Sequence, residues 1–156
     1  MTLALDFADR ISGLVLVATG ARLRVAPTIL EGIRDAFERT TENITRLAWS
    51  PEATARLTRL GHRALLETGP DVLLGDFIAC DRFDAIKRMG EIEVPTLVIA
   101  GTADQLTPVK YARFLAQQIA GADLFTVESA GHMVMLERPT EVTQAVQGFL
   151  GNLHAT

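Results

Sequence analysis

Three short runs of apolar residues divide this chain and predict buried β-strands. They lie at Gly13 to Ala18, Thr96 to Ala100 and Leu124 to Val127. A continuous apolar run of this length is typical of a strand covered on both faces, as in a parallel sheet. Segments in which apolar residues recur at helical spacing lie beside these runs. Before the first run they are Leu3, Ala4, Phe7 and Ala8, and after the second they are Tyr111, Phe114, Leu115 and Ile119. After the third run they are Val142, Ala145, Val146, Phe149, Leu150 and Leu153. This alternation predicts an α/β fold with three parallel strands and flanking helices.

Residues 27–89 contain helical patterns but no convincing strand. We therefore expect residues 1–26 and 90–156 to form an α/β core, and residues 27–89 to form a helical cap inserted into it. The first helix of this insertion is expected to carry Ile29, Ile33 and Phe37 on its inner face. Helix starts or caps are predicted at Thr28, at Ser50 with Pro51, at Thr107 with Pro108, and at Thr140, and a helix break is predicted at Gly69 with Pro70.

Composition places the chain among folded proteins and excludes some partners. The 156 residues are 48% hydrophobic with a net charge of −4, and acidic and basic residues are interspersed. No basic block is present, which argues against nucleic acid or a membrane surface as the main partner. Cys80 is the single cysteine, so no intrachain disulfide can form and a reducing, cytoplasmic location is expected. The apolar run from Ile11 to Thr19 is too short to span a bilayer.

The candidate chemistry lies in the loops that follow the second and third predicted strands. Asp104 follows the strand that ends at Ala100, and His132 lies in the small-residue turn that follows Val127. The carboxyl ends of adjacent parallel strands meet at one sheet edge, where open α/β sheets place their sites. A histidine titrates near neutral pH and can transfer protons in both directions, and a carboxylate can orient it. We therefore predict that Asp104 and His132 form an acid–base pair.

Other reactive side chains have simpler structural interpretations. The Ser129 hydroxyl is expected to stabilise its turn, Ser12 precedes a strand, and Ser50 starts a helix. Cys80 is expected to be a small buried hydrophobe, and Met133 and Met135 are expected to fill the core, with the lining of a pocket as the alternative. His62 and His154 lack metal-ligand spacing, and Asp81 and Asp84 are expected to cap helices. None of these residues provides a nucleophile on a strand-to-helix elbow. No metal and no cofactor is expected.

The order of motifs from Thr96 onward resembles the carboxyl-terminal part of α/β-hydrolase-fold proteins of the esterase, lactonase and haloperoxidase-like group. The motifs are a strand, the Gly101-Thr-Ala-Asp104 loop with Thr107-Pro108, a helix, a strand, and the Ala130-Gly-His132 loop with Leu136-Glu-Arg-Pro139. In that family the loops after the seventh and eighth strands carry the triad acid and histidine, in chain order nucleophile, acid, histidine. The resemblance implies these roles for Asp104 and His132. It also matches residues 3–17 to the helix behind the nucleophile and the sixth strand.

The chain departs from the family pattern because it contains no Gly-x-Ser-x-Gly elbow. Two functions follow as hypotheses. The first is a hydrolase of a small ester, lactone or related acyl compound whose serine nucleophile lies outside this chain, so that the chain alone is expected to be inactive. The second is a catalytically inactive, truncated module that acts in binding or assembly.

The first predicted strand also indicates a partner. In the family's sheet the sixth strand has a neighbour on each side, so Gly13 to Ala18 is expected to form an open edge here. The run contains neither a lysine nor a proline that would discourage pairing. We therefore expect a homodimer, or a complex with a complementing upstream half, joined through Gly13 to Ala18.

Overall fold

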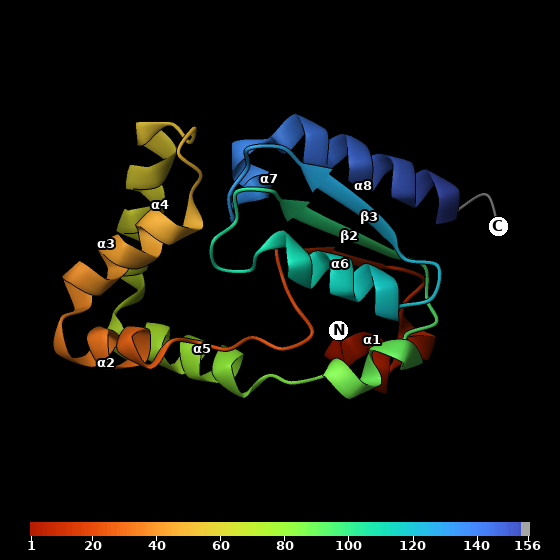
Figure 1. Ribbon diagram of the computed structural model, residues 1–156, viewed down its shortest axis with the longest axis horizontal. Helices are drawn as coiled ribbons and strands as arrows, with labels where there is room; N and C mark the ends of the chain where they lie inside the picture. Colours follow the sequence, from red (N-terminus) through yellow and green to blue (C-terminus); the bar gives the residue numbers. More distant parts are fainter. Residues whose placement is uncertain (154–156) are drawn as a thin grey trace.

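A three-stranded parallel sheet forms the centre of the computed structural model, which describes residues 1–153 (Figure 1). Its strands are β1 (Leu14–Val17), β2 (Thr96–Gly101) and β3 (Asp123–Val127), in the order β1-β2-β3. Leu16 is in register with Val98, and Val98 with Leu124. The three strands occupy the predicted apolar runs within one or two residues, so the predicted α/β class is confirmed.

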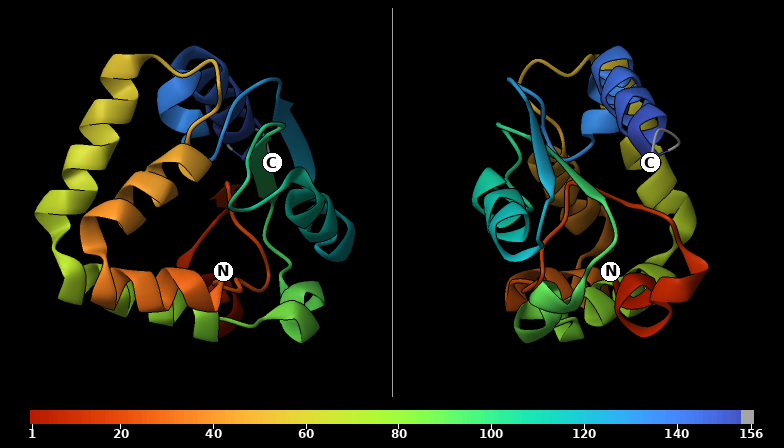
Figure 2. Two further views of the ribbon diagram at one scale, coloured as in Figure 1. Left: turned by 60° about the vertical axis from the view of Figure 1, so that its left-hand side comes forward. Right: turned by 90° about the vertical axis from the view of Figure 1, so that its right-hand side faces the viewer.

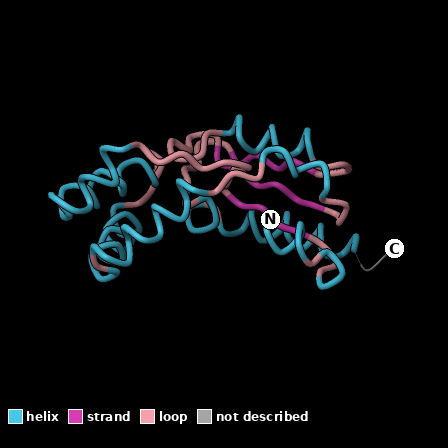
Figure 3. The backbone as a smooth tube through the Cα atoms, turned by 90° about the horizontal axis from the view of Figure 1, so that it is seen from below, coloured by secondary structure: helices cyan, strands magenta, loops and turns pink. Residues whose placement is uncertain are grey.

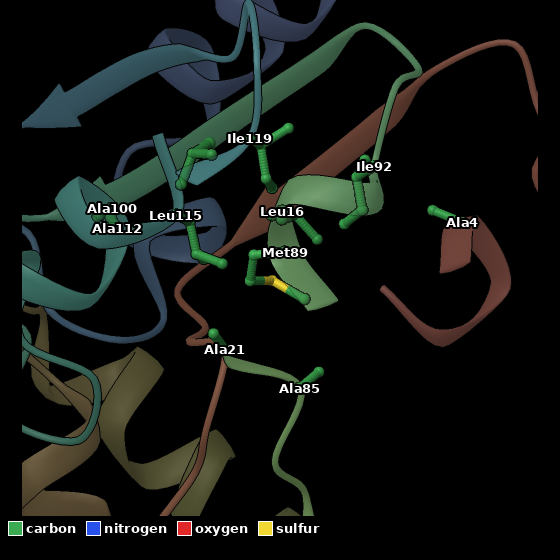
Figure 4. Close-up of a cluster of buried hydrophobic side chains, with 11 residues drawn as sticks. Ala4, Leu16, Ala21, Ala85, Met89, Ile92, Ala100, Ala112, Leu115 and Ile119 are labelled. Carbon is green, nitrogen blue, oxygen red and sulfur yellow. The ribbon is translucent and has the colours of Figure 1, made fainter. Parts of the chain in front are cut away.

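The side chains of β2 alternate between two hydrophobic layers because successive residues of a strand point to opposite faces. Val98 and Ala100 pack in the hydrophobic layer beneath α6 (Val109–Gln118). This layer also contains Leu115 of α6 (Figure 4). Leu97 and Ile99 pack in the opposite layer with Phe149 of α8 (Pro139–Leu153). All six residues of β2 are buried, as its continuous apolar pattern predicts. Figure 3 shows the strands between these helices.

The segment from residue 27 to 89 contains helices and no strand, as predicted. The four α-helices are α2 (Pro27–Asp35), α3 (Phe37–Ala48), α4 (Ala55–Thr68) and α5 (Pro70–Arg82), followed by the 3-10 helix η2 (Ile86–Glu91). They have their own small core around Ile33, Ile44 and Leu73. The α3 and α4 helices lie side by side at one end of the molecule (Figure 2). The division into a core and an inserted cap stays a prediction.

Four predicted helix starts are wrong. The α2 helix begins at Pro27 with Ala26 as its N-cap, so Thr28 lies inside it. Ser50 does not start a helix either, because α4 begins at Ala55 and Thr54 accepts the capping hydrogen bond. Thr107 does not cap α6, whose N-cap is Pro108, and Thr140 lies inside α8. A pattern of Ser or Thr near Pro does not distinguish the cap from the first helical turn, since the ring of Pro favours the first turn itself.

Three further differences lie in how the helices are divided. The helix predicted across Ile29 and Phe37 is divided at Ala36, whose φ of −151° ends α2 before α3 begins. The opening segment is two short pieces, α1 (Thr2–Asp6) and the 3-10 helix η1 (Ala8–Arg10). An additional turn, α7 (Val134–Glu137), precedes α8. Among residues 1–153, no helix combines the length and the apolar character needed to cross a bilayer.

Candidate active site

Asp104 and His132 meet at the carboxyl ends of β2 and β3. The His132 Nδ1 atom lies 3.0 Å from Asp104 Oδ2, which is hydrogen-bonding distance. The Asp104 side chain is fully buried, whereas 28% of the His132 side chain is exposed. Both strands end facing the helices of residues 27–89 (Figure 1). The sequence therefore predicted the contact between these two side chains, and the acid–base role itself stays a proposal.

The loop after β2 holds the Asp104 carboxylate from within three residues. Oδ1 accepts hydrogen bonds from the backbone N–H groups of Leu106 (2.8 Å) and Thr107 (2.9 Å). Oδ2 accepts a hydrogen bond from the Thr107 hydroxyl at 2.7 Å, and this hydroxyl lies 3.2 Å from His132 Nδ1. Sequence reasoning assigned Thr107 to a helix cap and missed this role. An Asp followed three residues later by Thr in a tight loop is the signal that could have indicated it.

Two opposing effects act on the ionisation of Asp104. Burial is the largest and by itself raises the pKa of the carboxyl group, because it disfavours the charged form. Hydrogen bonding to His132, the charge of His132 and the hydrogen bonds from Thr107 act in the other direction and leave the pKa of Asp104 below its ordinary value. Asp104 is therefore a carboxylate at neutral pH and acts as an acceptor toward His132.

The loop after β3 presents His132 through a tight turn. Ser129 has a φ of +56°, a left-handed conformation uncommon outside glycine, and its backbone N–H donates to Thr102 Oγ1 at 2.9 Å. Gly131 approaches the chain at Trp49 so closely that an added Cβ would lie 2.8 Å from the Trp49 carbonyl carbon. Ser129 thus lies in the turn, and the stabilising role predicted for its hydroxyl stays a prediction.

A cavity of about 390 Å³ lies beside His132. Its walls come from the loop after β1, from helices α2, α3 and α5, and from the Asp104 loop. The lining residues are Ala18, Leu23, Arg24, Val25, Ala26, Ile29, Leu47, Phe77, Cys80, Gln105, Leu106, Thr107, Tyr111 and His132. Most are apolar, and Thr107 and His132 add polar groups to the wall, which is the general character of a small-molecule pocket.

Among the described residues, no serine or cysteine side chain is hydrogen-bonded to the His132 ring. Cys80 lines the cavity and is exposed, so the prediction that it is a buried hydrophobe is wrong. Desolvation and then the negative charge of Asp76 raise the pKa of its thiol, which disfavours the reactive thiolate.

The remaining candidates of the sequence have structural contacts. His62 Nε2 lies 3.2 Å from Thr41 Oγ1 between α4 and α3, and His154 lies outside the described residues. Asp81 accepts a hydrogen bond from the Val25 backbone, and Asp84 accepts one from the Ile86 backbone at the start of η2. In the described part of the chain, no cluster of three or more His, Cys, Asp or Glu side chains could hold a metal ion.

Comparison with known proteins places this geometry in a family. The family model described as "Alpha/beta hydrolase family" matches residues 1–145. A solved structure of a thermophilic esterase superposes with a TM-score of 0.90 at 38% identity, over 97% of this chain and 60% of that one. The enol-lactonase from Burkholderia xenovorans gives a TM-score of 0.86 at 28% identity, over 96% of this chain and 60% of that one.

Curated relatives match a shorter part. Monoacylglycerol lipase ABHD6 of Bos taurus is 36% identical over 75 residues, which is 48% of this chain and 22% of the lipase. This chain thus spans only part of the length of its relatives. The family match covers far more than half of the chain, and the parallel sheet agrees with it. The chain belongs to the alpha/beta hydrolase family.

Proposed function

We propose that this chain supplies the acid and the base of a Ser-His-Asp triad, and one wall of the substrate pocket, to a hydrolase of small ester, lactone or related acyl compounds. The observation that carries the proposal is the hydrogen bond of 3.0 Å between Asp104 and His132 at the margin of an apolar cavity. Because Nδ1 is bonded to Asp104, Nε2 is the nitrogen left for exchange of protons with a nucleophile.

In this mechanism His132 takes the proton from a serine hydroxyl as the serine attacks the acyl carbon, and then donates a proton to the leaving group. Asp104 keeps Nδ1 protonated, which fixes the tautomer with a free Nε2, and its charge stabilises the imidazolium that forms. Thr107 holds Asp104 through Oδ2. The serine is not supplied by this chain, whose sequence contains no Gly-x-Ser-x-Gly motif.

The pocket supports a small and largely apolar acyl substrate. Ligand pockets commonly range from about 300 to 1,000 Å³, so a volume of about 390 Å³ lies at the small end of that range. Relatives described as an esterase, a monoacylglycerol lipase and an enol-lactonase agree with acyl hydrolysis as the reaction class.

The test is ester hydrolysis with and without a nucleophile. Purified chain alone is expected to give no turnover of p-nitrophenyl acetate or butyrate above buffer. Adding the amino-terminal part of a related hydrolase, which carries a Gly-x-Ser-x-Gly elbow, is expected to produce activity that His132→Ala abolishes. Asp104→Asn should lower kcat by about 10⁴, the loss known for the corresponding change in serine proteases.

Two results would contradict the proposal. Turnover by the chain alone that is lost in His132→Ala would mean that a nucleophile is present after all, and Ser129→Ala would then be the next variant. An assembled enzyme whose rate is unaffected by Asp104→Asn would remove Asp104 from the mechanism. If no elbow-bearing fragment yields activity, the alternative of a non-catalytic binding or assembly module is favoured.

A further inference from the structure

A buried carboxylate outside the acid–base pair connects the His132 loop to the helical segment. Glu137 ends α7, and only 9% of its surface is exposed. Its Oε1 atom accepts hydrogen bonds from the backbone N–H groups of Gly131 (3.1 Å) and Ser50 (3.3 Å). Ser50 and Glu137 are 87 residues apart in the chain, so this is a long-range tertiary contact. The mechanism above does not use Glu137.

The two loops joined by Glu137 also touch through their backbones. Met133 N–H donates to the Ala48 carbonyl at 3.1 Å. A Cβ added at Gly131 would lie 2.5 Å from Ser50 N and 2.7 Å from Glu137 Oε1. Such distances are closer than side-chain atoms tolerate, so only glycine allows this approach. Gly131 is thus linked to Ser50 through Glu137, and Met133 is bonded directly to Ala48 at the end of α3.

The same contact sets a wall of the cavity. Leu47, in the last turn of α3, lines the cavity together with His132. The α3 helix ends at Ala48, whose carbonyl is bonded to the His132 loop. The position of the wall and the position of the base therefore depend on one set of hydrogen bonds.

We propose that Glu137 is a positioning residue, which holds the His132 ring in register with Asp104 and fixes the Leu47 wall relative to it. Both hydrogen bonds are buried and join a carboxylate acceptor to backbone N–H donors. Removing the acceptor would leave these buried N–H groups without a partner, which lowers the stability of the fold. Glu137 acts through His132 and touches no reacting atom. The effect of Glu137 on catalysis rests on the proposed function. Its effect on the position of His132 can be measured in this chain alone.

Two substitutions separate positioning from charge. Glu137→Gln removes the negative charge but retains an oxygen that can accept from the backbone N–H groups of Gly131 and Ser50. Glu137→Ala removes the acceptor altogether. Glu52→Gln is the matched control, because Glu52 joins the same two loops through an exposed ion pair with Arg138 at 2.7 Å, and exposed pairs contribute little.

The first measurement is NMR of the isotope-labelled chain. Glu137→Ala is expected to abolish exchange protection of the Gly131 and Ser50 amides, and to broaden or remove the His132 Nδ1–H resonance. Glu137→Gln and Glu52→Gln should retain both signals, and Asp104→Asn should remove only the Nδ1–H signal. A sharp, unshifted Nδ1–H resonance in Glu137→Ala would overturn the proposal and leave Glu137 as a structural tether. If Glu137→Ala does not fold, Glu137→Asp, which moves the carboxylate back by one methylene, takes its place with the same expectations.

The second measurement uses the assembled hydrolase. Displacement of a catalytic group by about 1 Å can cost on the order of 100-fold, so Glu137→Ala should lower kcat by about that factor with little change in KM for p-nitrophenyl acetate, and Glu137→Gln should restore most of it. Equal losses in both variants would overturn the positioning role. If assembly yields no activity at all, the proposed function fails, and the NMR result still decides the role of Glu137.

Discussion

Replacing Asp104 by Asn tests the electrostatics of the pair through stability, without any need for activity. The carboxylate accepts two backbone hydrogen bonds at Oδ1, and it contacts Thr107 and His132 at Oδ2. An Asn side chain can keep both bonds at its oxygen. Its NH₂ group then faces the Thr107 hydroxyl and His132 Nδ1, both of which must become acceptors.

The expected cost follows from these bonds. A hydrogen bond to a charged group contributes about 1.5 to 3 kcal/mol and a neutral one about 0.5 to 1.5 kcal/mol, so weakening two bonds costs about 2 kcal/mol. Solvent screening does not reduce this figure, because the Asp104 side chain has 0% exposure. For a chain of this size, 1 kcal/mol shifts Tm by about 2 to 4 °C, so Asp104→Asn should melt about 4 to 8 °C lower at neutral pH.

The pH dependence has a definite sign. The pKa of Asp104 is lower in the folded chain than its ordinary value, so folding favours the ionised form. This stabilisation is complete above the unfolded pKa of about 3.9, and it is lost as pH falls through the still lower folded value. The difference in unfolding free energy between wild type and Asp104→Asn is therefore expected to be full near pH 6 and to shrink below about pH 4. Repeating the series with His132→Gln separates the contribution of the histidine.

Urea unfolding provides the assay. Trp49, the single tryptophan, is 6% exposed and reports the helical segment by fluorescence, while circular dichroism reports the whole chain. Asp9→Asn is the control, since its carboxylate is 78% exposed and should change stability by less than about 0.5 kcal/mol. A difference for Asp104→Asn as small as the control, or one that grows toward low pH, would refute the electrostatic account.

Two more predictions concern association and backbone conformation. The folded chain is expected to dimerise through the edge of the sheet at β1. Light scattering should then give twice the chain mass for the wild type and the mass of a monomer for Val15→Lys. A wild-type monomer whose Leu14 to Val17 amides are protected from exchange would exclude β1 as the dimer interface. Gly69 has φ 80° and ψ 159°, a region almost restricted to glycine, so Gly69→Ala should destabilise by about 1 to 3 kcal/mol in urea. Gly75, inside α5 with no atom near its missing Cβ, is the matched position where Ala should stabilise by up to about 1 kcal/mol; equal effects would contradict this account.

The sheet and the two site loops were predictable because their signals are local. The β2 run is apolar at nearly every position, and a fully buried parallel strand requires that composition. Once two such strands are adjacent and parallel, the loops at their carboxyl ends must lie together. The contact between Asp104 and His132 followed from this topology and from the family resemblance.

The helix starts and the supporting residues were not predictable in the same way. Thr28 and Thr140 have the residue type of a cap, and yet the first helical turn begins before them. The roles of Thr107 and Glu137 depend on which groups the fold brings near them. For Glu137, the partner Ser50 lies 87 residues away, and nothing in the local sequence indicates that contact.

The two halves of the site therefore differ in how they are built. Asp104 is held by backbone and hydroxyl groups of its own loop, none more than three residues away, so its geometry forms whenever the loop forms. His132 instead depends on Asp104, 28 residues away, and its loop depends on Glu137 and on the segment after α3. Because proteins open locally in separate units, opening of the helical segment would break the contacts of the His132 loop and leave the Asp104 loop intact. Substitutions in the helical segment should thus change the position of His132 more than the position of Asp104. The geometry of His132 is therefore the more sensitive measure of whether the pocket is correctly formed.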